Sequence, residues 1–405
     1  MAPNIVAART GKSDRVPGER SHNLYLDGVR GVAVLAVLLT HGTFLLSSTR
    51  LTRYILPPII FGWWGVDLFF VLSGFLITGI LLSTRTAPNR ASAFYARRVL
   101  RIFPIYYLCL AVLWIVSARS YWFGTMVPYT GAADRAAYLF YIQNWIPLWH
   151  SLTLKPNALG HFWSLAVEEQ FYLIWPWIVW KLSPKAVLWT CVLGAVSALA
   201  LRIALVSYFG PHLWIHCLTV TRGEGLLVGS ALAVLNSGDR RINPRLLWGM
   251  AITGLAVIAA IVVLDPAEFS NTDAGPYMYT ICISGLALVF GALVGGSQFR
   301  VPALTPALNA GWLRNVGKYS YGMYVYHIPL FYGIDHLIGK VSPFKGPLPN
   351  RYALAELLLL MAATYVTAFL SFVFIERPLL NLKRYFIAQV PRPAVPEQRS
   401  FVAGA

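Results

Sequence analysis

The chain has 405 residues, of which 57% are hydrophobic and only 12% are charged, and it contains 14 tryptophans. This composition excludes an ordinary soluble domain and favours a protein that crosses a membrane several times. The net charge of +17 would suggest a nucleic-acid partner in a soluble protein. In a membrane protein a bias of basic residues toward one side explains it better, so no nucleic acid is expected.

Ten apolar runs are long enough to cross a bilayer as helices. They cover residues 24–47, 60–82, 102–118, 162–181, 186–208, 219–235, 246–264, 277–296, 319–339 and 352–374. The predicted fold is therefore an all-α polytopic membrane protein with about ten transmembrane helices. We expect residues 1–21 to be a disordered basic tail, residues 22–382 the membrane domain, and residues 383–405 a cytoplasmic C-terminal tail.

The distribution of basic residues predicts the orientation of these helices. If the N-terminus is cytoplasmic, 22 of the 33 lysines and arginines fall in inside segments and 8 in outside segments. Cytoplasmic loops are enriched in these residues, so both termini are predicted to be cytoplasmic. The multi-pass protein is expected in a bacterial inner membrane, in contact with membrane lipids.

The first run, "LDGVRGVAVLAVLLTHG" at residues 26–42, holds two ionisable side chains, Arg30 and His41. Such groups are costly in hydrocarbon and usually face a protein interior or an aqueous cavity. At about 100° and 1.5 Å per residue they share one helix face and stand about 16 Å apart along the axis. Each could simply bond a neighbouring helix, but two polar groups on one face favour a pathway from the cytoplasmic mouth to the outer half.

The third run begins with "FYARRVLRIFP", which places Arg98 and Arg101 three residues apart and hence side by side on a helix. Their predicted depth is close to that of Arg30. Such a group can bind phosphates through charge-assisted, often bidentate hydrogen bonds. The alternative is an ordinary positive-inside flank.

Residues 119–161 follow, and within them "AAYLFYIQNWIPLW" is aromatic and moderately apolar but contains polar groups and has prolines nearby. We interpret this stretch as an interfacial or re-entrant element on the outside. A full span over residues 136–150 would reverse every later helix and remove the charge asymmetry.

Six charged residues in other apolar runs are predicted to lie within about two turns of the outer ends of their helices, which is close to the depth of His41. These residues are Asp67, Glu168, Glu169, Arg202, Arg222 and Glu224. The adjacent Glu168 and Glu169 in "FWSLAVEEQFYLIW" are costly unless paired or solvated, so they predict a water-accessible pocket. A structural salt bridge, for instance to Arg202, is the alternative for one of them.

No metal site is expected. His212 and His216 are four residues apart, but no glutamate follows as in a zincin, and the stretch is predicted to be an outer loop. The four cysteines lie in or beside apolar runs without metal-type spacing and are interpreted as packing residues, namely Cys109, Cys191, Cys217 and Cys282.

Two residues near the C-terminus complete the candidates. His327 in "YVYHIPL" lies near the predicted mid-membrane level, where it has either a hydrogen-bonded packing role or a substrate-binding role. Glu376 in "IERPLL" is expected to close a helix at the cytoplasmic interface, where Pro378 stops it.

The motifs occur in a recognisable order. They are "LDGVRGVAVLAVLLTHG", "GVDLFFVLSGFLIT", "YARRVLRIFPIYY", "FWSLAVEEQFYLIWP", "YSYGMYVYHIPL" and "FIERPLL". Together they resemble the acyltransferase 3 family of integral-membrane O-acyltransferases over about residues 22–382. The resemblance implies about ten helices and transfer of acyl groups from cytoplasmic acyl-CoA to hydroxyls of carbohydrates, lipids or antibiotics. Some members carry an additional extracytoplasmic hydrolase-like domain, which is not expected here.

The resemblance also implies roles for individual residues. Arg30 and His41 match the family's arginine–histidine motif, and Arg98 and Arg101 match its paired-arginine motif. Acyl transfer to an alcohol needs a base, and a neutral imidazole suits this near neutral pH, so His41 is expected to be the general base or a transient acyl carrier. The three arginines would bind acyl-CoA, a co-substrate and not a permanently bound cofactor.

The remaining candidates take supporting roles. Asp67, Glu168 and Glu169 are grouped with His41 as catalytic residues, and Arg202 and His327 are expected to bind the hydroxyl-bearing acceptor. A transporter or flippase of a polar solute is the main alternative function, although the inverted repeats that it would show are not apparent. A purely structural membrane protein would leave the buried ionisable residues without a purpose.

Overall fold

The computed structural model describes residues 23–45, 64–119, 127, 131–150, 157–238, 241–265, 268, 275–299, 301–302, 304–341 and 352–390. Within these ranges every regular element is a helix, and seven helices are long and apolar enough to cross a membrane. The all-α polytopic class is therefore confirmed. The count of about ten spans and the cytoplasmic termini stay predictions, and the tails at 1–21 and 391–405 lie outside the described residues.

The described part of each of the ten predicted runs coincides with helical structure, and three helices differ most from the prediction. The helix over the third run begins at Arg90, since its first turns are charged and escape a hydropathy criterion, and the helix over 319–339 begins at Gly311. The run at 219–235 divides at Gly223. In chain order the helices are α1 (Leu24–Leu45), α4 (Trp64–Ser83), α5 (Arg90–Arg119), α7 (Ala132–Leu139), η1 (Gln143–Trp149), η2 (Gly160–Phe162), α8 (Trp163–Lys181), α9 (Pro184–Phe209), α10 (Leu213–Cys217), α11 (Thr219–Arg222), α12 (Glu224–Leu235), α13 (Pro244–Leu264), η4 (Met278–Cys282), α14 (Ile283–Gly295), η5 (Gly296–Gln298), α15 (Leu304–Leu308), α16 (Gly311–Val341), α17 (Ala353–Ser371), η7 (Phe372–Glu376), α18 (Arg377–Asn381) and η8 (Leu382–Tyr385).

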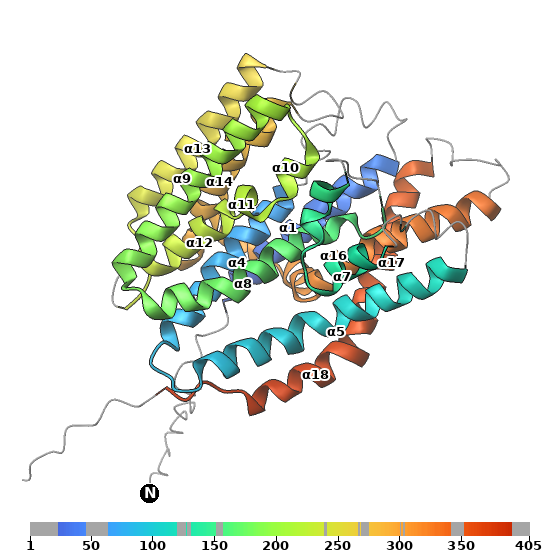
Figure 1. Ribbon diagram of the computed structural model, residues 1–405, viewed down its shortest axis with the longest axis horizontal. Coiled ribbons are helices and arrows are strands. Elements are labelled where there is room, and N and C mark those ends of the chain that lie inside the picture. Colours follow the sequence, from blue (N-terminus) through green and yellow to red (C-terminus); the bar gives the residue numbers. More distant parts are fainter. Residues whose placement is uncertain are drawn as a thin grey trace, which may run out of the picture.

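The centre of the bundle is formed by α1, α4, α12 and α16 (Figure 1), with α4 packed on α12 and α1 packed on both α4 and α16. Small residues allow the backbones to touch. A Cβ atom on Gly229 of α12 would lie 1.9 Å from the Val71 carbonyl oxygen of α4, and one on Gly317 of α16 would lie 1.9 Å from the Asp27 carbonyl oxygen of α1. This close approach brings polar side chains of α1 and α16 within reach of each other.

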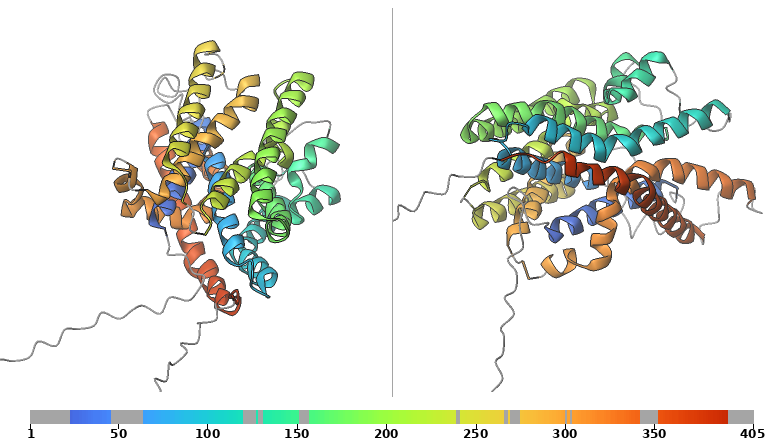
Figure 2. Two further views of the ribbon diagram at one scale, coloured as in Figure 1. Left: turned by 90° about the vertical axis from the view of Figure 1, so that its left-hand side faces the viewer. Right: turned by 90° about the horizontal axis from the view of Figure 1, so that it is seen from below.

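Helices α9 and α13 lie at one side of the bundle (Figures 1 and 2) and are apolar on almost every face. Leu193 and Val196 of α9 and Ile252 and Val263 of α13 are all exposed. A helix that is hydrophobic all round and yet exposes large aliphatic side chains is typical of a lipid-facing element.

The described part of the 119–161 stretch forms short helices that cannot span. Helices α7 and η1 have 8 and 7 residues, whereas a span needs about 20. They are held by a buried polar network, in which Gln170 of α8 donates to the Tyr141 carbonyl at 2.7 Å and to the Asn144 side chain at 2.9 Å, and Asn144 donates to Thr219 at 2.9 Å. The interpretation of residues 136–150 as a non-spanning element agrees with this arrangement.

The expectation that Pro378 stops a helix at Glu376 was wrong. The chain continues from α17 through a π-helical turn, η7, into α18, and Pro378 lies in the first turn of α18. A proline is tolerated there, because the π-helical turn before it interrupts the regular hydrogen-bond pattern in which its missing amide hydrogen would take part. The resulting C-terminal helix lies beside α5 (Figure 1), which it contacts through η7 and α18.

Candidate active site

Three histidine side chains from distant parts of the chain meet inside the bundle, His41 of α1, His161 of η2 and His327 of α16. The ring centroids of His41 and His327 are 4.9 Å apart, and those of His161 and His327 are 4.7 Å apart. His161 and His327 are buried, and His41 is half-buried. The structure thus joins two predicted site residues and adds His161, which sequence reasoning missed although it directly precedes the "FWSLAVEEQ" motif.

Backbone carbonyls determine which ring nitrogen of His41 carries hydrogen. Its Nδ1 lies 3.0 Å from the Val37 carbonyl oxygen, which can only accept, so in the neutral ring Nδ1 is the donor and Nε2 holds the lone pair. Nδ1 of His327 similarly donates to the Tyr324 carbonyl at 2.6 Å, and its Nε2 lone pair faces His41 Nδ1 at 3.2 Å. Both contacts orient His41, and no hydrogen bond within the described residues uses its Nε2.

His161 also has a ring nitrogen, Nδ1, whose lone pair accepts no hydrogen bond among the described residues. Its Nε2 donates to the Val325 carbonyl at 3.2 Å, which leaves Nδ1 as the acceptor. That nitrogen is buried and has no hydrogen-bond partner among the described residues. The Tyr324 hydroxyl donates to the His161 carbonyl at 2.9 Å and pairs with Ser164, so η2 is fixed to α16. An unsatisfied buried acceptor is costly, and a ligand hydroxyl would satisfy it.

The structure also brings Arg30, Arg98 and Arg101 into electrostatic range of one another. Arg30 donates to Asp27 at 2.7 Å. The guanidinium of Arg98 lies 5.9 Å from the ring centroids of Phe94 and Tyr172, and its Nε is buried without a partner. Over the described ranges neither Arg98 nor Arg101 has a hydrogen bond or an ion pair.

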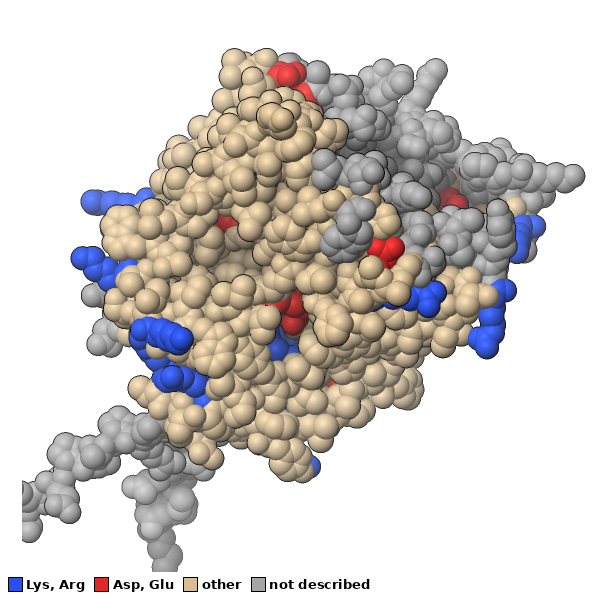
Figure 3. Space-filling model, viewed as in Figure 1, with Lys and Arg blue, Asp and Glu red and all other residues tan. Residues whose placement is uncertain are grey.

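The two carboxylates of α8 lie on the arginine side of the site. Tyr172 donates to Glu168 at 3.3 Å, and the charged neighbours of Glu168 include Arg98 and Arg101. Glu169 is likewise in electrostatic range of Arg98. Figure 3 shows acidic side chains with basic ones behind them, recessed in a depression of an otherwise largely uncharged face near α8.

This placement corrects the expectation that Glu168 and Glu169 lie at the level of His41. His161 occupies that level at the start of α8, and Glu168 follows about 10 Å further along the helix axis. The alternative for one of these carboxylates, a salt bridge to Arg202, is not formed, because Arg202 pairs with Glu224.

The remaining charged candidates form a buried ion-pair cluster. Asp67 of α4 meets Arg222 through two nitrogen–oxygen contacts of 2.8 and 3.0 Å, and Arg202 of α9 pairs with Glu224 of α12. Ser284 accepts from Arg202 at 2.8 Å and donates to Glu224 at 3.0 Å. Arg202 and Arg222 are 0% and 1% exposed. Their charges are satisfied within the protein, which favours a structural role over the expected catalytic role of Asp67 and the expected substrate-binding role of Arg202.

In the described part of the chain, no group of three His, Cys, Asp or Glu side chains, the histidine cluster included, is placed so that it could hold a metal ion. The ring of His216 lies between Trp163 and Tyr279, with centroid distances of 5.2 and 5.6 Å. Burial, together with the charges of Arg222 and Arg202, lowers the pKa of His216 well below its ordinary value, so this ring is neutral. The four cysteines are buried and free.

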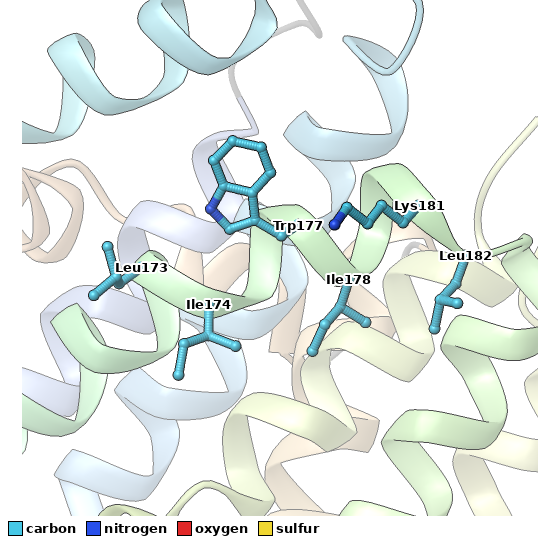
Figure 4. A pocket seen from close by; sticks show the side chains of 6 residues that line it. All are labelled: Leu173, Ile174, Trp177, Ile178, Lys181 and Leu182. Atoms are coloured by element: carbon cyan, nitrogen blue, oxygen red, sulfur yellow. The ribbon is translucent and has the colours of Figure 1, made fainter.

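A groove of about 530 Å³ lies on another face of α8 (Figure 4). The residues that line it are Leu173, Ile174, Trp177, Ile178, Lys181 and Leu182. None of the candidate catalytic or phosphate-binding residues reaches it. Leu173 and Ile174 are 64% and 60% exposed, so this apolar surface is suited to lipid chains and not to the reaction.

Comparison with known proteins identifies the family of the segment that contains the histidine cluster and the arginine group. The family model described as an acyltransferase domain matches residues 23–376. The peptidoglycan O-acetyltransferase OatA of Listeria monocytogenes is 31% identical over 371 residues, which cover 87% of this chain and 55% of that relative. The putative peptidoglycan O-acetyltransferase YrhL of Bacillus subtilis is 29% identical, with coverage of 87% and 54%.

The O-acetyltransferase OatA of Staphylococcus aureus is 26% identical and covered to a similar extent, 87% of this chain and 56% of the relative. The chain therefore spans about half the length of the curated relatives it matches. No solved structure matches it.

Proposed function

This chain belongs to the family defined by that acyltransferase domain, and on this premise we propose that it is a membrane O-acyltransferase that moves an acetyl group from cytoplasmic acyl-CoA to a carbohydrate hydroxyl. One observation carries the proposal. His41 is an oriented imidazole whose Nε2 makes no hydrogen bond among the described residues. It lies on the same helix as Arg30, which adjoins two arginines that form no hydrogen bond or ion pair within the described ranges. The acceptor class follows from relatives whose names specify peptidoglycan, so we propose a cell-wall glycan.

The contrast between the two buried arginines, Arg202 and Arg222, and the half-buried Arg98 and Arg101 supports the donor site. Arg202 and Arg222 each have a carboxylate partner, as an arginine in a protein interior requires. Arg98 and Arg101 have no such partner among the described residues, and a planar guanidinium is well suited to bidentate phosphate binding. Glu168 and Glu169 lie near Arg98 but form no ion pair with it, so the two phosphates of the CoA diphosphate would provide the direct partner that the arginines lack.

The distance between the two sites also supports acyl-CoA. Arg30 and His41 are separated by about 16 Å along α1, which is comparable to the extended pantetheine arm. With its phosphates at the arginines, the thioester carbon of the donor would reach His41 Nε2.

In the proposed reaction, His41 Nε2 accepts the proton of the acceptor hydroxyl as its oxygen attacks the thioester carbon. The carbon–sulfur bond then breaks, the ester forms, and the proton leaves with the CoA thiol. If His41 is transiently acylated instead, its Nε2 attacks the thioester carbon and the carbon–sulfur bond breaks, releasing the CoA thiolate. The acceptor oxygen then takes the acyl group from Nε2, the nitrogen–carbon bond breaks, and the hydroxyl proton passes to the thiolate. His161 Nδ1 would accept a hydrogen bond from the acceptor and so orient it, and His327 would hold His41 in place.

Glu168 and Glu169 would act on the donor side. Their positions near Arg98 favour orientation of the arginine side chains over proton abstraction, because the carboxylates flank guanidinium groups and not the histidines.

Incubation of the purified protein with labelled acetyl-CoA and glycan fragments tests this function. We expect alkali-labile acetyl label on the hydroxyls of the glycan, because an O-acetyl ester is hydrolysed by base. Binding of acetyl-CoA without label transfer to any glycan or glycolipid would contradict the proposed reaction, and uptake of a polar solute into proteoliposomes would favour the transporter instead.

Arg98→Gln and Arg101→Gln are each expected to weaken CoA binding by about 1–3 kcal/mol, because each removes a charged donor to phosphate. Equilibrium binding in detergent measures the effect. Arg119→Gln is the matched control, since Arg119 lies at the exposed far end of the same helix and should leave the affinity unchanged. Wild-type affinity in both variants would place the donor site elsewhere.

A further inference from the structure

The segment that follows α18 is attached to the start of α5 by a single side chain. Asn89, the residue before α5, donates from Nδ2 to the Ile387 carbonyl at 2.9 Å, and its Oδ1 accepts from the Gln389 amide at 2.8 Å. Helix α18 and the short helix η8 also contact α5, and Figure 2 shows the C-terminal helix running alongside it. Both polar atoms of the Asn89 amide thus hold residues 387–389, and η8 packs on α5 just before them.

This attachment holds Lys383 of η8 against the cationic face of α5. The charged neighbours of Lys383 are Arg101, Arg98 and Arg97, with Glu376 as the acidic one. Four basic groups thus face a single acidic side chain, Glu376, and this excess of positive charge attracts an anion. The next residue, Arg384, is exposed and does not take part in this cationic group. Its guanidinium lies 4.9 Å from the centroid of the Tyr385 ring.

The basic residues follow one another from the histidine cluster outward in the same order as the phosphate groups of acyl-CoA follow one another from the thioester. Arg30 is in electrostatic range of Arg98 and Arg101, whereas Lys383 is in range of these two and of Arg97. Asn89 holds Ile387 and Gln389 at the start of α5, eight residues before Arg97, so the segment that contains Lys383 runs toward that end of α5. The histidine cluster lies toward the other end, because the Val325 carbonyl contacts both Cys109 of α5 and His161. This places the Lys383 segment on the side of the arginine pair that faces away from the histidines. In CoA the diphosphate follows the pantetheine arm, and the phosphomonoester on the ribose is more distant from the thiol than the diphosphate is.

We propose that Lys383 binds the ribose 3′-phosphate of the acyl donor, and that Asn89 positions Lys383 by holding the C-terminal segment against α5. This inference rests on the proposed function, since it takes CoA as the donor. A compact ammonium group with three donors suits a dianionic phosphomonoester, while the planar guanidinium groups of the arginine pair suit the diphosphate.

Equilibrium binding of CoA and of dephospho-CoA, which lacks the 3′-phosphate, tests the inference on the full chain in detergent. Lys383→Met is expected to weaken CoA binding about tenfold and to change dephospho-CoA binding less than twofold, because only CoA presents the group that Lys383 contacts. Arg384→Met, which removes the adjacent charge, should leave both affinities unchanged. Lys383→Arg should restore most of the preference for CoA.

A second variant tests whether the hydrogen bonds of Asn89 to the C-terminal segment position Lys383, and it leaves every charged side chain in place. Asn89→Ala releases residues 387–389 and should reduce the preference for CoA over dephospho-CoA in the same direction as Lys383→Met. Unchanged CoA affinity in Lys383→Met, or equal weakening of CoA and dephospho-CoA, would overturn the inference. Failure of the wild-type protein to bind either compound would instead overturn the proposed acyl donor, so the two failures are distinguishable.

Discussion

His41→Gln is expected to lower acyl transfer at least a hundredfold while CoA binding stays at the wild-type level. Glutamine preserves much of the volume and the hydrogen-bonding capacity of histidine, but its amide cannot accept and release a proton near neutral pH. A general base contributes about 10²–10⁴ in rate, so the loss should fall in that range. Turnover with labelled acetyl-CoA and equilibrium binding of CoA measure the two quantities.

The matched control for this substitution is His212→Gln. His212 is exposed and lies outside the histidine cluster, so its variant should retain full turnover. Near wild-type turnover in His41→Gln would make His41 a structural residue. The base would then have to be another ionisable group of the site. His161 is the first candidate, because its Nδ1 also makes no hydrogen bond among the described residues.

The second large effect concerns stability. Arg222→Met is expected to lower the free energy of unfolding by about 3–5 kcal/mol, because it leaves Asp67 buried and without its partner. The lost contacts of the guanidinium with the rings of Phe70 and Trp163, at 5.8 and 5.5 Å, add to the cost. Unfolding of the purified protein in mixed micelles, followed by circular dichroism, measures the change.

The double variant separates an unpaired charge from a general loss of packing. Asp67→Leu combined with Arg222→Met removes both charges, and it should recover much of the lost stability, because apolar replacement of a buried ion pair is often neutral. Arg98→Gln should leave the stability close to that of the wild type, since Arg98 is half-buried and the substitution breaks no ion pair. A stable Arg222→Met variant that has lost turnover would instead place the Asp67–Arg222 pair in the reaction.

Features that depend on local sequence could be predicted well. The apolar runs predict the helices because each span must be apolar along its own length. The shared face of Arg30 and His41, and the adjacency of Arg98 and Arg101, follow from the helical repeat without knowledge of any neighbour. The matched motifs also predicted the family, which the comparison confirms.

The partners of the charged residues could not be predicted in this way. Burial cost shows that Asp67, Arg202 and Glu168 need a partner, but the choice among several ions of opposite sign at similar depth depends on how the helices rotate and cross. The structure pairs Asp67 with Arg222 and Arg202 with Glu224, and it turns Glu168 toward the arginines of α5.

Thus the sequence by itself determined the class of protein, the positions of the helices, and the residues with chemistry to offer, because these depend on composition and on the period of a single helix. Only the tertiary structure decided that His161 and His327 join His41, and that Lys383 returns to α5. These contacts join residues far apart in the chain, and they require close backbone packing such as that of Gly317 against α1, together with specific side-chain clamps such as Asn89.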